Sequence, residues 1–379
     1  MSNSLFHIYA GTQGSAGLYI NEIIKALDLA NIKQNAFVSY YYPFKNGKKI
    51  FYRFTDLAAG KKKTKYRPYI RYVELICGLL IIFFEALFKR PRYINYSLNS
   101  SYLPEYAFLV LIKKMLKIKL IITCHDVVPF ANSYLNISKE NSRRAYLLNM
   151  ADFLLVHNEN SIVDLMQYYQ IKPSKIICHP FPIMDLNPWI KADITKTIDF
   201  LFIGHLRCEK GINILLESWE KFSSLYPEAN LYVVGNNPPN SGIDVTKYKK
   251  YNIKFVLHYV DDAVYAQYIA SAKCVILPYL RGTNSGIPSS VYSLGSDLIV
   301  SDIPMFKNNP LIGKESYFEC GNSNSLFEKM CSFYKELHKE TSIKKERIDS
   351  YRQSFNNQVV QLYSQFTTVQ RNFLRHDLN

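Results

Sequence analysis

Several familiar functional signatures are missing from this chain of 379 residues. Its seven cysteines are odd in number, scattered and nowhere in C-x-x-C spacing, which argues against a disulfide framework and a zinc site and favours a reducing cytoplasm. Neither G-x-G-x-x-G nor G-K-[ST] occurs, so the dinucleotide fingerprint and the P-loop are not supported. The amino terminus lacks a basic region followed by an apolar run, and we therefore expect no signal peptide.

Long apolar runs are also scarce. The clearest one, YVELICGLLIIFFEALF, covers residues 72–88 and includes Glu74 and Glu85. Its length is at the lower limit for crossing a bilayer, and acidic side chains are costly inside one. We therefore expect a buried or interfacial helix here rather than a transmembrane one.

Acidic residues are too few to balance the basic ones, and the imbalance is local. Residues 1–185 hold 24 Lys and Arg against 12 Asp and Glu, whereas the remainder holds 22 against 19. The excess is densest between Lys45 and Arg71, next to the apolar run. Such a tract is either a solvated loop or a surface that attracts the anionic cytoplasmic leaflet of a membrane. We predict membrane binding by its most basic part, which comprises Lys61, Lys62, Lys63, Lys65 and Arg67.

Apolar segments that end in polar turns alternate with amphipathic segments along most of the chain. Residues 5–10 indicate a strand, the turn GTQGSAG follows, and a helix continues from Leu18. This alternation is typical of parallel sheets covered by helices on both faces, the α/β class. The length exceeds that of one hydrophobic core, and a proline-rich segment interrupts the pattern. The predicted organisation is a first domain over 1–180, a linker over 181–195, a second domain over 196–350 and a helical tail over 351–379.

Two cations follow the first strand expected in the second domain. In FLFIGHLRCEKGINILLESW, the apolar run that starts at Phe200 ends at Gly204, Arg207 and Lys210 come next, and an amphipathic helix follows. Strand-to-helix connections lie at the carboxyl edge of a parallel sheet, where α/β proteins bind ligands. Helix amino termini favour anions, so this pattern suits a phosphate, although a solvated turn would look similar.

A second candidate anion site follows another expected strand of the same domain. After ILPYL comes a loop of small residues, RGTNSG, and Pro288 marks the first turn of a helix. Backbone N–H groups and hydroxyls at that point would suit an anion. Together, the two connections could hold one diphosphate.

Two expected strands of the first domain end in histidine. His125 follows KLIITC and is adjacent to Asp126, and His157 follows DFLLV. Neighbouring residues of a strand point to opposite faces, so His125 and Asp126 do not form part of a catalytic triad. His157 is more typical of a packed or exposed histidine than of a catalytic one.

These segments resemble family 4 of the retaining glycosyltransferases. FIGHLRCEKGINILLESW is similar to that family's FG-x-IR-x-x-KG joint, SAGLYINEIIKAL to its glycine-rich opening, and ILPYLRGTNSGIPSSVYSLGSDLIVSD to its LPY…SG segment. The resemblance spans nearly the whole chain. It implies the GT-B fold, with two Rossmann-like parallel-sheet domains facing a cleft, and a C-terminal helical tail that crosses back to the first domain.

The resemblance also implies roles for individual residues. Arg207 and Lys210 would bind the diphosphate of a nucleotide sugar, linked to UDP or GDP, and His125 would correspond to the family's strand-end histidine. Gly17 would let the first domain's loop reach the sugar. The far phosphate would be held by the loop amides of Asn284, Ser285, Gly286 and Ile287.

The chain departs from the family at one point. Many members carry two glutamates in the pattern E-x7-E, and those places fall here to Thr283 and Val291. A subset of the family lacks both, so activity is compatible with the change. No D-x-D pair occurs, and we expect cations rather than a metal ion to neutralise the diphosphate. The family's retaining chemistry is thought to proceed by attack on the face that the phosphate leaves.

The expected function is that of a cytoplasmic hexosyltransferase on the inner face of the plasma membrane. It would transfer sugar to a glycan or lipid-linked glycan, as in capsule or O-antigen synthesis. Three alternatives stay open: a nucleotide-sugar 2-epimerase of the same fold, a degenerate member of the fold that lacks the glutamates and acts as a partner subunit, and a non-catalytic basic protein that binds nucleic acid. The last has only the charge in its favour, because the basic tract lacks regular aromatic interleaving beyond Tyr66, Tyr69 and Tyr72. We therefore expect no nucleic-acid partner.

Overall fold

The computed structural model describes most of the chain. The described residues are 5–11, 15–42, 47–56, 65–98, 102–125, 127, 137–190, 194–237, 244, 246–248, 251–282, 285–336 and 342–367. The chain divides into two compact units. The first comprises Met1–Pro182 with Ser354–Asn379, and the second comprises Ile183–Gln353. The division at Pro182 falls inside the segment 181–195 that the sequence predicts to be a linker.

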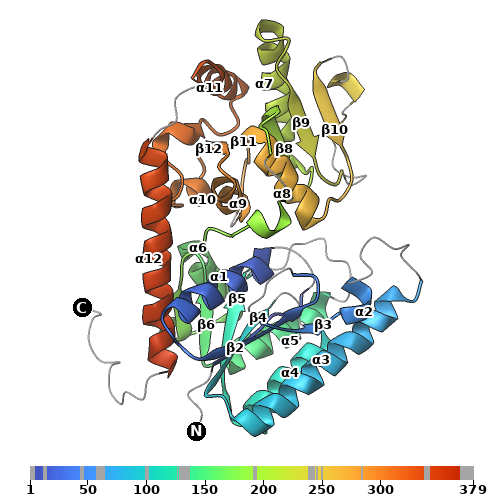
Figure 1. The fold of residues 1–379 in the computed structure, drawn as a ribbon, viewed down its shortest axis with the longest axis vertical. Coiled ribbons are helices and arrows are strands. Elements are labelled where there is room, and N and C mark those ends of the chain that lie inside the picture. Colours follow the sequence, from blue (N-terminus) through green and yellow to red (C-terminus); the bar gives the residue numbers. More distant parts are fainter. Residues whose placement is uncertain are drawn as a thin grey trace. The chain divides into compact units, whose positions relative to one another are not determined.

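The first unit is built on a seven-stranded parallel sheet in the order β3-β2-β1-β4-β5-β6-β7 (Figure 1). Its strands are β1 (Leu5–Ile8), β2 (Gln34–Ser39), β3 (Lys48–Phe51), β4 (Tyr93–Leu98), β5 (Lys119–Cys124), β6 (Phe153–Val156) and β7 (Ile176–Cys178). Its helices are α1 (Ser15–Leu29), α2 (Arg53–Asp56), α3 (Arg67–Lys89), α4 (Leu103–Lys114), α5 (Ile137–Met150) and α6 (Glu159–Tyr169). The basic tract is therefore not one loop, because it contains β3 and α2.

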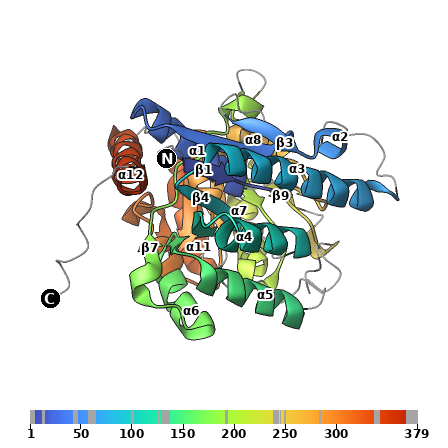
Figure 2. The same cartoon turned by 90° about the horizontal axis from the view of Figure 1, so that it is seen from below.

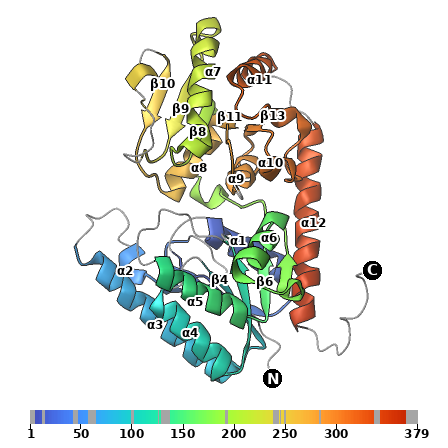
Figure 3. The same cartoon turned by 180° about the vertical axis from the view of Figure 1, so that it is seen from behind.

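Helices cover both faces of this sheet, as the continuous apolar runs of its strands require. Helix α3 lies beside α4, and α4 beside α5 (Figure 2). Viewed from behind, these three helices lie across one face of the sheet (Figure 3), where they contribute Leu79, Ile112 and Leu147 to the core. Helix α1 lies on the other face.

The last helix, α12 (Ser342–Thr367), returns to the first unit. Tyr363 of α12 is fully buried, and its hydroxyl accepts a hydrogen bond of 2.9 Å from Asn95 Nδ2 on β4. Thr123 Oγ1 on β5 donates to Asn95 Oδ1 at 2.9 Å. Buried polar groups of this kind are costly unless they are paired, so the network fixes the position of α12 on the sheet.

The second unit contains a six-stranded parallel sheet in the order β10-β9-β8-β11-β12-β13. The strands are β8 (Ile198–Ile203), β9 (Leu231–Val234), β10 (Ile253–Val256), β11 (Ala272–Leu277), β12 (Asp297–Ser301) and β13 (Tyr317–Phe318). The helices are α7 (Ile212–Leu225), α8 (Asp262–Ser271), α9 (Ile287–Ser293), α10 (Pro304–Lys307) and α11 (Ser323–Lys335). Phe200 and Phe202 of β8 face the core beneath α7 and α11, whereas Leu201 and Ile203 face the core beneath α8 and α9.

The apolar run at 72–88 forms most of α3, and this helix is buried on one side only. Leu75, Leu79 and Ile82 face the core. The two acids of the run have local partners, since Glu74 accepts hydrogen bonds of 2.6 Å from Phe54 N and Thr55 Oγ1, and Glu85 pairs with basic side chains. Within the part of the chain that the structure describes, no helix combines the length and apolar character needed to cross a membrane.

Candidate functional site

The connection from β8 to α7 is a tight turn that brings two cations to the carboxyl edge of the second sheet. Residues Cys208–Lys210 form a single 3-10 turn, and Gly211, with φ of 65°, is the N-cap residue directly before α7. A Cβ on Gly211 would lie 1.7 Å from the Pro278 carbonyl oxygen. The amide of Leu280 donates to the Glu209 carbonyl at 2.9 Å. Glycine is therefore needed so that the turn can pack directly on the end of β11.

Lys210 lies over an aromatic ring that sequence reasoning did not single out. Its Nζ is 3.7 Å from the centroid of the Tyr279 ring, and Tyr279 is almost completely buried at 1% exposure. A cation in this position is attracted by the ring's electron-rich face. Burial, with a smaller contribution from Arg207, lowers the pKa of Lys210 to about 8, while Glu209 acts in the opposite direction. The Tyr directly after the strand in LPYL is the signal that could have identified this residue.

Positive charge dominates the turn. Arg207 Nη1 lies 3.7 Å from Glu209 Oε1, which is longer than a strong charge-assisted hydrogen bond. The pKa of His205 is lowered, mainly by partial burial of its ring and further by Arg207 and Lys210. The ammonium and the guanidinium thus lie in one turn, where Glu209 interacts with both, and an incoming anion would be stabilised by the two cations.

The loop between β11 and α9 reaches the same tyrosine. A side-chain hydrogen bond with Ser285 acts on the Tyr279 hydroxyl and opposes the larger effect of burial, which raises the pKa of Tyr279. Tyr279 therefore has Lys210 at its ring and Ser285 at its hydroxyl. Gly286 and Ile287 continue from there into the first turn of α9. Asn284, which was also predicted to bind the donor, lies outside the described residues, as does Thr283.

The second position of the E-x7-E pattern is not available to a ligand. Val291 is fully buried on α9 and belongs to the core of the second unit. Val291 is therefore an apolar packing residue at the place where many members of the family that the sequence resembles carry a carboxylate.

The candidate residues of the first unit meet at the carboxyl ends of β5 and β6. His125 Nδ1 lies 3.0 Å from His157 Nε2, and His157 Nδ1 lies 3.1 Å from the His179 carbonyl oxygen. Tyr19 of α1 contacts both rings, with centroids 5.1 Å from His125 and 4.9 Å from His157. Phe181 packs edge-on against His157 at 5.0 Å. His157 is therefore a packed histidine, one of the two possibilities that the sequence left open, and it also contacts His125.

Gly17 lies in the first turn of α1, at the same edge of the first sheet. A Cβ there would be 2.1 Å from Cζ of Tyr42, which is fully buried. The absence of a side chain therefore has a packing reason in addition to the sugar-binding role that the resemblance implies.

The predicted membrane-binding cations are only partly described. Lys65 is exposed, with Nζ 5.1 Å from the centroid of the Tyr66 ring. Arg67 is half-buried, and its Nη2 donates to the Thr55 carbonyl at 3.3 Å. Lys61, Lys62 and Lys63 lie outside the described residues.

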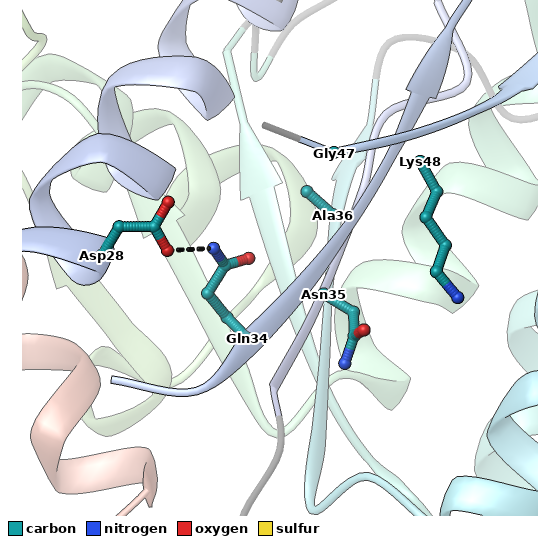
Figure 4. Close-up of a pocket in the computed structure, with 6 residues that line it drawn as sticks. All are labelled: Asp28, Gln34, Asn35, Ala36, Gly47 and Lys48. Atoms are coloured by element: carbon teal, nitrogen blue, oxygen red, sulfur yellow. Dashed lines mark hydrogen bonds between the residues drawn. The ribbon is translucent and has the colours of Figure 1, made fainter. Parts of the chain in front are cut away.

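A pocket in the first unit includes none of the site residues predicted from the sequence. It lies at the amino-terminal ends of β2 and β3 and is lined by Asp28, Gln34, Asn35, Ala36, Gly47 and Lys48 (Figure 4). Gln34 Nε2 donates to Asp28 Oδ1 at 2.9 Å. The pocket is thus at the edge of the sheet opposite to His125. Across the residues described, no group of three or more His, Cys, Asp or Glu side chains could hold a metal ion.

Comparison with known proteins identifies one matching family model. Residues 197–335 match the family model described as Glycosyl transferases group 1. No curated protein matches the chain.

Solved structures that are similar to this chain cover nearly all of it, as three examples show. Sucrose-phosphate synthase from Thermosynechococcus elongatus has a TM-score of 0.61 at 14% identity, covering 96% of this chain and 98% of that one. The catalytic domain of Starch Synthase IV from Arabidopsis thaliana, bound to ADP and acarbose, has a TM-score of 0.62 at 12% identity, covering 97% and 100%. A protein from Listeria monocytogenes that is assigned as a UDP-N-acetylglucosamine 2-epimerase has a TM-score of 0.57 at 12% identity, covering 99% of this chain and 100% of that one. These similarities confirm the predicted GT-B fold.

Proposed function

We propose that this chain is a retaining glycosyltransferase that moves a hexose from a UDP- or GDP-linked donor to a glycan, as in the synthesis of a lipid-linked polysaccharide precursor. The observation that carries the proposal is the turn at Arg207 and Lys210, which concentrates positive charge at the carboxyl edge of the second sheet. The match of residues 197–335 to glycosyl transferases group 1 supports the same assignment, because it includes this turn.

The two cations would act on the leaving group. When the bond from the sugar's anomeric carbon to the diphosphate oxygen breaks, negative charge develops on the departing diphosphate. Preorganised cations in a partly dry site stabilise such charge far more than water does. Arg207 offers a planar fork for two phosphate oxygens, and Lys210 offers a compact charge held over Tyr279. With these groups in place, the reaction needs no metal ion.

The remaining steps follow from retention. The acceptor hydroxyl would attack the anomeric carbon from the face that the diphosphate leaves, and its proton would pass to a departing phosphate oxygen. Ser285, Gly286 and Ile287 would contact the far phosphate together with Asn284. His125 and Gly17 would lie on the sugar side of the reaction, as the resemblance implies.

Replacing either cation tests this proposal. Arg207→Ala and Lys210→Ala should each lower the rate of sugar transfer on the order of a hundredfold, because a preorganised charge is lost in the transition state. Release of UDP or GDP from nucleotide sugars in the presence of a glycan acceptor gives the rate. Lys221→Ala is a matched control, since Lys221 is an exposed cation on α7 that bonds to Asn324. Wild-type rates in both single variants would refute the assignment.

The products separate the proposal from the epimerase alternative. A transferase forms a glycosidic bond to the acceptor and releases a nucleoside diphosphate. A 2-epimerase changes the configuration of the sugar without needing an acceptor. Chromatography of a reaction without acceptor should therefore show unchanged nucleotide sugar, and a 2-epimer would contradict the proposed reaction.

We further propose that the first unit binds the inner face of the plasma membrane. The support is an exposed apolar stripe on α3 with helical spacing, next to the basic tract. Its largest members are Tyr69, Val73, Leu80, Phe84 and Phe88, with exposed fractions of 74%, 58%, 51%, 53% and 81%. A helix with one apolar exposed face and flanking cations is typical of interfacial binding.

Vesicle sedimentation tests the membrane proposal. Each cation near an anionic leaflet contributes about 1 kcal/mol, so replacing Lys61, Lys62, Lys63, Lys65 and Arg67 by Ser or Gln should release the protein from vesicles containing phosphatidylserine. Phe84→Ser with Phe88→Ser should weaken the binding separately by removing apolar area. Nucleotide binding should stay intact in both. Absence of vesicle binding by the wild type would show that the basic tract is only solvated.

A further inference from the structure

Three histidines occupy equivalent places at the ends of three neighbouring strands in the first unit. Strand β5 pairs with β6, and β6 with β7, all in parallel. Continued past the strand ends, this register places His125 beside His157 and His157 beside His179. The backbone amide of His179 donates to the Val156 carbonyl at 2.8 Å, which extends the ladder beyond β7. The three residues therefore form a row across the sheet edge.

Hydrogen bonds in this row run in one direction only. The carbonyl oxygen of His179 can only accept, so the proton at His157 Nδ1 must be present for the 3.1 Å contact to be a hydrogen bond. Burial, followed by the neighbouring His125, lowers the pKa of His157 well below its usual range. A neutral imidazole with a proton on Nδ1 has a lone pair on Nε2. His157 Nε2 therefore accepts the Nδ1–H of His125 across 3.0 Å.

The orientation of His125 follows from this order. Burial lowers the pKa of His125 to about 4, so its ring is neutral at physiological pH. With the proton on Nδ1, its Nε2 carries an unshared pair. That atom is buried, and no described residue bonds to it. Tyr19 and Phe181 pack against the two rings and restrict their rotation.

We propose that His157 is a positioning residue, which accepts the Nδ1–H of His125 and so presents the unprotonated Nε2 of His125 to a hydrogen-bond donor of the substrate. This inference depends on the proposed glycosyltransferase function in one respect, which is that the group donating the hydrogen bond is a sugar hydroxyl. The tautomer itself is a property of the free protein. His157 acts through His125 and does not touch the reacting atoms.

Nitrogen NMR on histidine-labelled protein tests the tautomer directly, because protonated and unprotonated ring nitrogens differ in chemical shift. In the wild type, His125 should show a protonated Nδ1 and an unprotonated Nε2, and His125→Gln identifies its signals by removing them. His157→Gln keeps an acceptor for Nδ1–H and a donor for the His179 carbonyl, so the tautomer of His125 should persist. His157→Leu removes the acceptor, and the proton of His125 should move to Nε2.

Measurements of enzyme activity provide a second test. His157→Leu should lower kcat/KM about tenfold or more, whereas His157→Gln should restore most of it. Melting temperatures show whether each variant folds. If a variant does not fold, the wild-type spectrum still decides which tautomer His125 adopts. A protonated Nε2 on His125 in the wild type would overturn the proposal. The same tautomer of His125 in the His157→Gln and His157→Leu variants would overturn it as well. Absence of sugar transfer by the wild type would refute the enzyme assignment, while the spectra still decide the role of His157.

Discussion

Raising the pH from 7 to 9 should weaken the binding of UDP or GDP, because Lys210 loses its proton in that range. Its pKa of about 8 is well below the ordinary lysine value of 10.5, mainly through burial beside Tyr279 and also through Arg207. Arg207 stays charged throughout, and the phosphates are already ionised, since their second pKa is about 6. The charge on Lys210 therefore changes within this pH range.

The size of the effect follows from the protonated fraction. With a pKa of about 8, Lys210 is about 91% protonated at pH 7 and about 9% protonated at pH 9. If the diphosphate binds only the charged form, the apparent Kd should rise about tenfold. The direction is consistent with linkage, since a bound anion raises the pKa of Lys210 and binding near pH 8 takes up a proton.

Isothermal titration calorimetry in buffers of different ionisation enthalpy measures both quantities. The Kd for UDP or GDP and the number of protons taken up would be obtained between pH 7 and pH 9. Lys210→Arg is the matched control, because a guanidinium stays charged and should remove most of the pH dependence. A Kd that is constant over this range in the wild type would refute the reasoning, as would an equal tenfold rise in the Arg variant.

Two further predictions concern stability. Gly211→Ala should destabilise the protein by about 2 kcal/mol or more, because the new Cβ would meet the Pro278 carbonyl. Gly295→Ala is the comparison: its φ is 70° and no atom lies within 4 Å of the new Cβ, so it should cost only about 1 kcal/mol for the backbone conformation. Equal losses in urea unfolding would show that the contact is unimportant. Burial lowers the pKa of His7 to about 3 and that of His179 to about 4, compared with 6.5 in the unfolded chain. Below pH 6.5 the unfolded chain therefore binds protons that the folded protein does not, and the free energy of unfolding should decrease by about 2 kcal/mol for each histidine by pH 5. A melting temperature that does not decrease between pH 7 and pH 5 would contradict this.

The sequence by itself determined the local pieces of the fold and of the second unit's site. The alternation of apolar runs and amphipathic segments predicted two parallel α/β sheets, because burial on both faces imposes that pattern on the strands. The turn at Arg207 and Lys210 was predicted because its strand, its glycines and its helix are contiguous. A contiguous strand-turn-helix has its geometry set largely by its own residues.

Only the tertiary structure decided which distant residues meet. Tyr279 comes beneath Lys210 because β8 and β11 pair in the sheet, and that pairing depends on packing between segments far apart in the chain. The histidine row depends on strand register, since one residue of slip would turn each side chain to the other face. His157 and His125 are 32 positions apart, and no local pattern states that they share a row. The return of α12 likewise depends on Asn95 and Tyr363, which are 268 positions apart and are joined only once both sheet and helix exist.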